Sequence, residues 1–80
     1  MRYHIWTKYT DAANPTMTEC YSKAECDRLV KQILEAVPMG SAAEIRVEPC
    51  VSVRKRLAAG KNRYDRIILV DRSHSVRILK

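Results

Sequence analysis

Apolar and polar positions follow two different periods along the chain, and each period predicts a different kind of element. Residues 2–9 are rich in aromatic and β-branched residues and alternate, with Ile5 on one face and Trp6 on the other, which is typical of a strand. Turn formers at 11–15, including an Asn-Pro step, then predict a hairpin that returns along residues 16–21.

A helical period begins after that hairpin. Ser22 stands three residues before Glu25, the spacing of a capping box, so we expect a helix to begin there. Pro38 and Gly40 end the helix. Apolar residues recur at helical spacing and predict one stripe that covers a sheet, namely Cys26, Leu29, Val30, Ile33 and Val37.

The second half of the chain predicts further strands. Residues 43–53 alternate, but Pro49 cannot donate a ladder hydrogen bond, so we expect an edge position or a bulge at Pro49-Cys50. The continuous apolar run at 66–70 suits a central strand contacted on both faces, and residues 75–79 form a last strand.

Residues 54–63 allow two structures, a hairpin tip centred on 59–62 or a short helix capped by Ser52 and ended by Gly60. The hairpin is the structure we expect. The prediction is then an α+β fold with a single helix packed on an antiparallel sheet, in the order β-β-α-β-β-β. At 80 residues, the chain has room for one domain, residues 1–80.

Charge is distributed unevenly along the chain. Residues 1–50 hold six Lys or Arg against seven Asp or Glu, whereas residues 51–80 hold nine bases against only Asp65 and Asp71. The clustered positive charge predicts a surface that meets an anionic partner, because such a surface raises the local concentration of opposite charge. The same bases have a second interpretation, in which they keep the domain soluble and protect an edge strand from aggregation.

Candidate contact residues follow from this charge. The segment 54–63 has five bases and no acid, Tyr64 is the aromatic residue beside them, and Arg66 can extend the surface along the next strand. The predicted partner-binding residues are Arg54, Lys55, Arg56, Lys61, Arg63, Tyr64 and Arg66. The remaining aromatic residues lie mostly in the first hairpin, where we expect them to pack in the core or on the sheet.

Several kinds of chemistry are disfavoured. The three cysteines and two histidines lack the spacing of a zinc site, and Gly60-Lys61-Asn62 lacks the other residues of a phosphate-binding loop. A single convincing helix of mixed charge argues against a helix-turn-helix. We therefore expect no enzyme activity, no metal and no cofactor; a small enzyme using Cys and His is the least favoured hypothesis.

The cysteine pattern also bears on the compartment. Three cysteines at uneven spacing give no disulfide framework, so we expect them to be reduced and buried as small apolar residues. No apolar run is long enough to cross a bilayer and no signal-like stretch opens the chain. These features predict a cytoplasmic protein, a monomer or homodimer, with no membrane partner.

The element order and size resemble those of several small phage-encoded inhibitors, the anti-CRISPR proteins among them: a strand pair, a Ser-capped helix beginning at Ser22, and a closing set of strands. This resemblance implies a non-catalytic protein that docks on a larger nucleoprotein complex. Its basic surface would occupy a groove meant for nucleic acid or bind an acidic subunit.

Two hypotheses therefore follow. The first is a small binding module that docks through its basic surface on a nucleic-acid-handling protein complex and blocks it. The alternative is direct binding of DNA or RNA by the basic 54–63 hairpin, which counterion release would make steeply dependent on salt.

Overall fold

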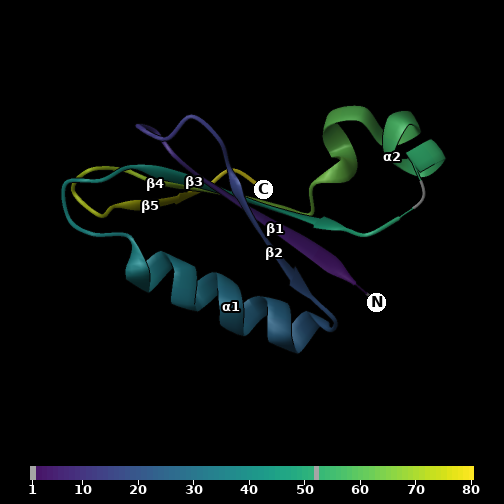
Figure 1. Cartoon of the computed structure of the whole chain (residues 1–80), viewed down its shortest axis with the longest axis horizontal. Coiled ribbons are helices and arrows are strands. Elements are labelled where there is room, and N and C mark those ends of the chain that lie inside the picture. Colours follow the sequence, from purple (N-terminus) through teal and green to yellow (C-terminus); the bar gives the residue numbers. More distant parts are fainter. Residues whose placement is uncertain (1, 52) are drawn as a thin grey trace.

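The α+β fold is confirmed by a computed structural model that describes residues 2–51 and 53–80 (Figure 1). Within these residues the strands pair antiparallel throughout in one sheet of order β2-β1-β3-β4-β5. In chain order the elements are β1 (Tyr3–Tyr9), β2 (Thr16–Cys20), α1 (Lys23–Ala36), β3 (Ala43–Pro49), α2 (Val53–Ala59), the 3₁₀ helix η1 (Gly60–Arg63), β4 (Arg66–Val70) and β5 (Val76–Ile78).

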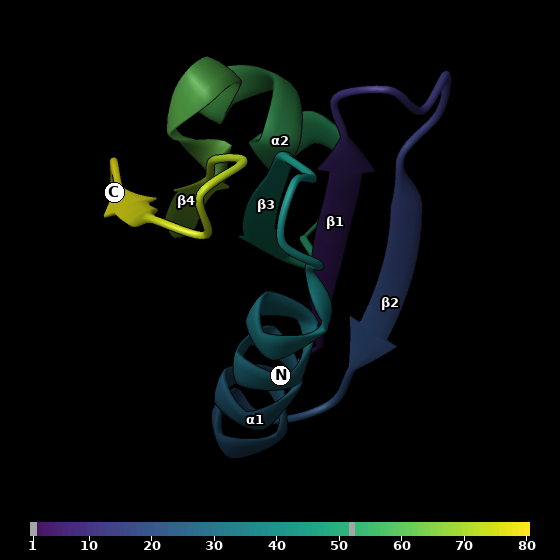
Figure 2. The same cartoon turned by 90° about the vertical axis from the view of Figure 1, so that its left-hand side faces the viewer.

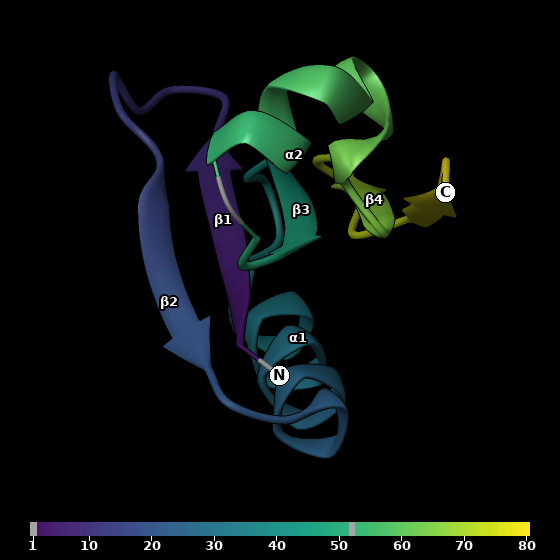
Figure 3. The ribbon, with the colours of Figure 1, turned by 90° about the vertical axis from the view of Figure 1, so that its right-hand side faces the viewer.

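The two helices lie on opposite sides of the sheet. Seen edge-on, α1 lies below the strands and α2 above them (Figures 2 and 3). The loop between β1 and β2 rises on the same side as α2 (Figure 1). We call the side of the sheet away from α1 the open face, because α2 covers only one end of it. Neither helix in the described ranges is long and apolar enough to cross a membrane.

Helix α1 forms as the sequence predicts. The Ser22 hydroxyl accepts a hydrogen bond from the Glu25 amide at 3.1 Å, which satisfies one of the unpaired amides at the helix start. At the other end Val37 leaves the helix, and Gly40 takes a positive φ of 90° that glycine adopts without steric cost.

The hydrophobic core lies between α1 and the sheet. Strand alternation turns the odd-numbered residues of β1 and β3 toward α1, where they meet the apolar stripe of the helix. Buried residues of the main cluster are Ile5, Cys20, Cys26, Val30, Ile45, Val47 and Ile68. Leu29 and Ile33 pack against this cluster and are only partly buried.

Strand β3 is not an edge strand, so that part of the sequence prediction is wrong. It lies between β1 and β4, and Pro49 is its last residue. The Cys50 amide donates to Arg2 on the β1 side, whereas the Val47 carbonyl accepts from Asp65 on the β4 side. Because successive residues of a strand direct their backbone groups to opposite sides, the Pro49 nitrogen faces β4. The pairing between β3 and β4 stops at Val47, so Pro49 has no β4 partner and its missing N–H costs the sheet no hydrogen bond.

The hairpin expected at 54–63 is also wrong, because these residues form α2 and η1, the alternative structure. The run from Arg54 to Ala59 contains only good helix formers, and Gly60 ends it with a positive φ of 56°. The proposed cap, Ser52, lies outside the described residues. The chain thus crosses from β3 to β4 through α2 and η1, which rise above the open face (Figure 1).

Candidate functional site

A buried carboxylate on the open face organises the basic residues around it. Glu48 is only 2 % exposed, although its side chain points away from the core. Its Oε1 accepts hydrogen bonds from Nε1 of Trp6 at 2.8 Å and from Nη2 of Arg56 at 2.7 Å, and its Oε2 lies 3.4 Å from Nε of Arg63. Glu48 therefore fixes α2 and η1 to the sheet through one arginine from each. We call this arrangement the Glu48 clamp.

The clamp keeps Glu48 ionised. Burial alone would raise the pKa of this carboxyl, but hydrogen bonds from Arg56 and Trp6 and the charges of Arg56 and Arg63 outweigh it, so the pKa lies below its usual range. The same hydrogen bond raises the pKa of Arg56. Both partners are therefore charged across the physiological range.

Because the folded-state pKa of Glu48 is lowered, the clamp should stabilise the fold fully above the unfolded carboxyl pKa of about 4.3. This stabilisation should be lost as the pH falls through the lower folded-state pKa. We expect the free energies of unfolding of wild type and Glu48→Gln, measured in urea at several pH values, to converge below pH ~4. A difference that stays constant down to acid pH would contradict the charged clamp.

Beside the clamp lies a groove of about 390 Å³ on the open face. Residues of β1 and β3 form its floor. One wall is formed by α2, η1 and Tyr64, which precedes β4, and the other wall is formed by Pro15 at the end of the β1–β2 loop. The lining residues are Trp6, Lys8, Pro15, Glu44, Arg46, Glu48, Arg56, Arg63 and Tyr64.

Tyr64 holds two arginines of the groove in place. The guanidinium carbon of Arg63 lies 4.7 Å from the centre of the Tyr64 ring, and that of Arg46 lies 5.0 Å from it. Nη2 of Arg63 also donates to the Tyr64 hydroxyl, and Nε of Arg46 donates to Glu44 at 2.6 Å. These contacts position the guanidinium groups while leaving 42 % of the Arg46 side chain and 39 % of the Arg63 side chain exposed.

The structure separates six of the seven predicted contact residues into three groups. Arg54 and Lys55 are exposed on α2, whereas Arg56 and Arg63 face Glu48 and line the groove with Tyr64, which is itself only 9 % exposed. Arg66 points to the other side of the sheet, where its Nη1 pairs with Asp27 of α1 at 2.8 Å. The side chain of Lys61 lies outside the described residues.

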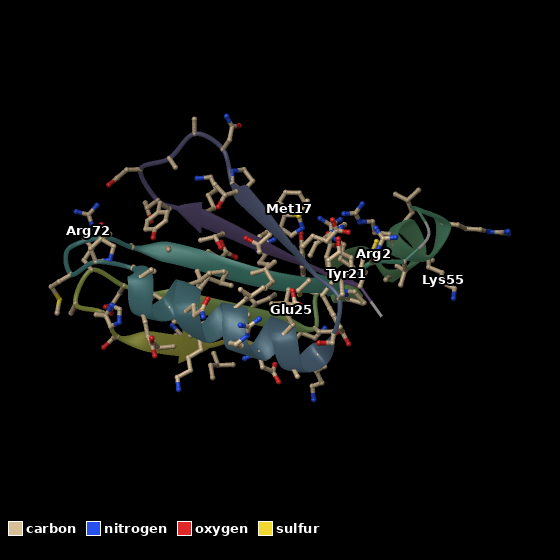
Figure 4. All side chains as sticks on the ribbon, turned by 60° about the horizontal axis from the view of Figure 1, so that its bottom comes forward. Arg2, Met17, Tyr21, Glu25, Lys55 and Arg72 are labelled. Carbon is tan, nitrogen blue, oxygen red and sulfur yellow. The ribbon has the colours of Figure 1, made fainter. Side chains whose placement is uncertain are left out.

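Not all of the other Lys and Arg residues at 51–80 lie beside the predicted contact residues. Arg72 lies at the opposite end of the molecule from Lys55 (Figure 4), and its Nη2 is 4.0 Å from a carboxylate oxygen of Asp11. The uneven charge of the sequence is therefore not one continuous surface.

Sequence reasoning missed six of the nine groove residues, Pro15 and Glu44 among them. Trp6, Lys8, Arg46 and Glu48 lie in or beside strands whose alternation was recognised, so their shared face could have been assigned once β1 and β3 were known to be neighbours. Trp6 pairs directly with Arg46 in the register, and Lys8 with Glu44. No local sequence pattern predicts that two strands far apart in sequence will pair.

The three cysteines differ in burial. Cys20 and Cys26 are buried together in the core, and burial followed by the contact with Cys20 raises the pKa of Cys26 to about 12, so that thiol stays protonated. Cys50 is exposed, which corrects the expectation that all three are buried. His4 stacks edge-on against Trp6, and His74 lies in the turn before β5.

Among the residues that the structure describes, no group of three or more His, Cys, Asp or Glu side chains gathers as a metal site would require. Comparison of this chain with family models, with curated proteins and with solved structures gives no match. The geometry of α2 and the groove is therefore the basis for inferring a function.

Proposed function

We propose that this protein is a small non-catalytic binding module that docks through α2 on an acidic surface of a nucleic-acid-handling protein complex and blocks it, as an anti-CRISPR-like inhibitor would. The observation that carries the proposal is the way α2 is held. The Glu48 clamp fixes the inner side of the helix to the sheet, and the rest of the helix projects into solvent (Figure 3).

The outer side of α2 has the chemistry of a docking surface. Arg54, Leu57 and Ala58 are spaced i, i+3 and i+4, so they share the side of the helix opposite Arg56, and all three are exposed. Leu57 is 78 % exposed and could act as an apolar anchor in a partner's pocket. Positive charge beside it, from Arg54 and Lys55, would steer an acidic protein toward the helix.

A binding role also fits the electrostatics of the clamp. A general acid at neutral pH needs a carboxyl whose pKa is raised, whereas the pKa of Glu48 is lowered. Glu44, the other groove carboxylate, is paired with Arg46. Both groove acids therefore serve to hold arginines, which is what a preorganised binding surface requires.

Direct binding of nucleic acid by α2, the alternative hypothesis, has less support. Leu57 stands in the middle of the exposed stripe, where a phosphate-binding surface would carry a donor, and Arg56 is already occupied by Glu48. An apolar anchor flanked by bases is more typical of a protein interface core and its polar rim.

The test is affinity purification of the tagged protein from its native host, with Leu57→Asp as the variant. Wild type should retain a protein of a nucleic-acid-handling complex, and Leu57→Asp should weaken that binding by at least 30-fold, about 2 kcal/mol, the size of an interface hot spot. Binding of the purified partner would be measured by calorimetry.

The matched control is Leu79→Asp, which makes the same change at another exposed leucine, next to β5. It should leave the affinity within a factor of about 2. Equal affinities for wild type and Leu57→Asp, or a retained partner unrelated to nucleic acid, would contradict the proposed function.

A further inference from the structure

We propose that the groove on the open face is a second binding site, which takes one nucleotide unit of a single-stranded nucleic acid. In this arrangement the base lies against the indole of Trp6, and its phosphate is bound by the guanidinium groups of Arg46 and Arg63. The site uses the sheet face and not the outer side of α2, so it is independent of the docking proposal.

The charge of the groove favours an anionic ligand. Four basic side chains, Lys8, Arg46, Arg56 and Arg63, line it against two acids. Glu48 is 2 % exposed and lies under its arginines, and Glu44 is bound to Arg46. The groove therefore has a net charge of +2; Glu48 is covered, whereas Glu44 is 34 % exposed and paired with Arg46.

The arginines are already positioned for phosphate. Arg46 and Arg63 are held against Tyr64, and each guanidinium has five N–H donors, of which the intramolecular contacts use only some. Roughly two fifths of each side chain remains exposed, 42 % and 39 %. A guanidinium held in one orientation loses little conformational entropy on binding and can form two parallel hydrogen bonds to a phosphate.

Trp6 distinguishes a nucleotide from an acidic peptide. Its ring is fixed at Nε1 by Glu48, stands edge-on to His4, and lies opposite Arg46 in the strand register. A half-buried indole with a fixed plane beside basic groups is the arrangement on which nucleobases stack. Aspartate and glutamate side chains have no flat group that would use it.

The size of the groove favours a single strand. Its volume of about 390 Å³ falls in the range of small-ligand pockets, roughly 300–1,000 Å³, which suits one nucleotide and excludes a duplex. In a duplex the bases are also stacked inside and cannot reach a side chain on a sheet face. A strand entering the groove could unstack one base onto Trp6.

Trp6 is the single tryptophan of the chain, so its fluorescence reports directly on the groove. Titration with a short oligothymidylate should quench this fluorescence saturably, because a stacked base quenches indole emission. With Lys8, Arg46 and Arg63 counted as about three cationic contacts to phosphates of the strand, the affinity should fall roughly 20-fold between about 50 and 200 mM salt. A matched duplex, a free mononucleotide and a polyglutamate peptide are titrated in the same way.

Variants assign the contacts, and fluorescence anisotropy of a labelled oligothymidylate measures their affinity. Trp6→Leu should weaken binding roughly 5- to 150-fold, whereas Trp6→Phe, which keeps a flat ring, should retain most of it. Arg46→Ala should weaken binding, and it should reduce the slope of log affinity against log salt concentration by about the contribution of one phosphate contact. Arg28→Ala removes the same charge from the exposed surface of α1 and should change neither the affinity nor its salt dependence.

Arg46 is the informative arginine, because its loss removes only the contacts with Glu44 and the Tyr64 ring and leaves the Glu48 clamp intact. Circular dichroism would check that each variant is folded. The proposal is overturned if the oligothymidylate does not quench Trp6, if Arg28→Ala weakens binding as much as Arg46→Ala, or if polyglutamate binds more tightly than the oligonucleotide. Equal affinity for the free mononucleotide and the strand would also overturn it.

Discussion

Glu48→Ala should destabilise the protein by about 3 kcal/mol, a large share of the ~4–12 kcal/mol expected for 80 residues. The substitution leaves the Trp6 indole N–H and the Arg56 and Arg63 guanidinium groups facing the space left by the carboxylate. Removing one partner of a buried ion pair costs about 3–5 kcal/mol. We expect the lower end, because the two arginine side chains are 38 % and 39 % exposed and water can replace part of the lost contact.

The measurement is urea unfolding at neutral pH, together with amide hydrogen exchange of residues 53–63. Exchange should accelerate in α2 and η1, since their attachment to the sheet depends on Glu48. Glu44→Ala is the matched control, because it removes an acid from the same strand and face that pairs with a half-exposed arginine, and it should cost at most about 1 kcal/mol. Equal effects of the two substitutions would show that Glu48 has no special role.

Ile45→Ala should cost about 2–5 kcal/mol. Ile45 is fully buried in the middle of β3, the central strand, and belongs to the core cluster that joins the sheet to α1. Truncation removes three carbon atoms and leaves a cavity that strands on both sides prevent from closing. The free energy of unfolding from urea denaturation would measure this cost.

Ile78→Ala is the control for that measurement, because it makes the same change in β5, where the side chain is 71 % exposed. Its cost should stay within about 1 kcal/mol. If both isoleucines cost the same, the burial assigned to the two strands would be wrong. The cost of Leu29→Ala in free energy of unfolding should fall between those of the two isoleucine substitutions, since Leu29 is only partly buried against the core.

Elements governed by local chemistry could be predicted from the sequence. The hairpin of β1 and β2 follows from alternation and the Asn-Pro turn, and α1 follows from the Ser22 cap and its apolar stripe. The strands β4 and β5 were placed correctly for the same reason. In each case the sequence pattern and the tertiary environment favour the same structure.

The segment that folds differently is the one with competing local preferences. Gly60 suits both a hairpin tip and a helix end, and helix propensity decides in favour of α2 because no apolar alternation supports a strand there. Pro49 also had two possible places in the sheet. Its missing N–H favours an edge position, unless the neighbouring strand does not extend to that residue; β4 pairs with β3 only as far as Val47, so Pro49 has no partner there. The place of Pro49 in the sheet is not visible without the lengths of the paired strands.

The groove could be predicted only in part. Arg56, Arg63 and Tyr64 were identified from the basic segment, but the residue that organises them, Glu48, reads in sequence as an ordinary solvent-facing acid on an alternating strand. Its burial depends on α2 folding over the end of the sheet (Figure 1). The long-range pairing of β1 with β3, which brings Trp6 to the same place, is equally inaccessible to local patterns.

We propose that the projecting helix α2, held by Glu48, is the surface that meets the partner. Amide hydrogen exchange, measured on the protein alone and in its purified native complex, would show whether α2 is covered. We predict that residues 53–63 become protected in the complex while α1 exchanges as in the free protein. Protection confined to α1 or to β5, with α2 exchanging unchanged, would contradict the account.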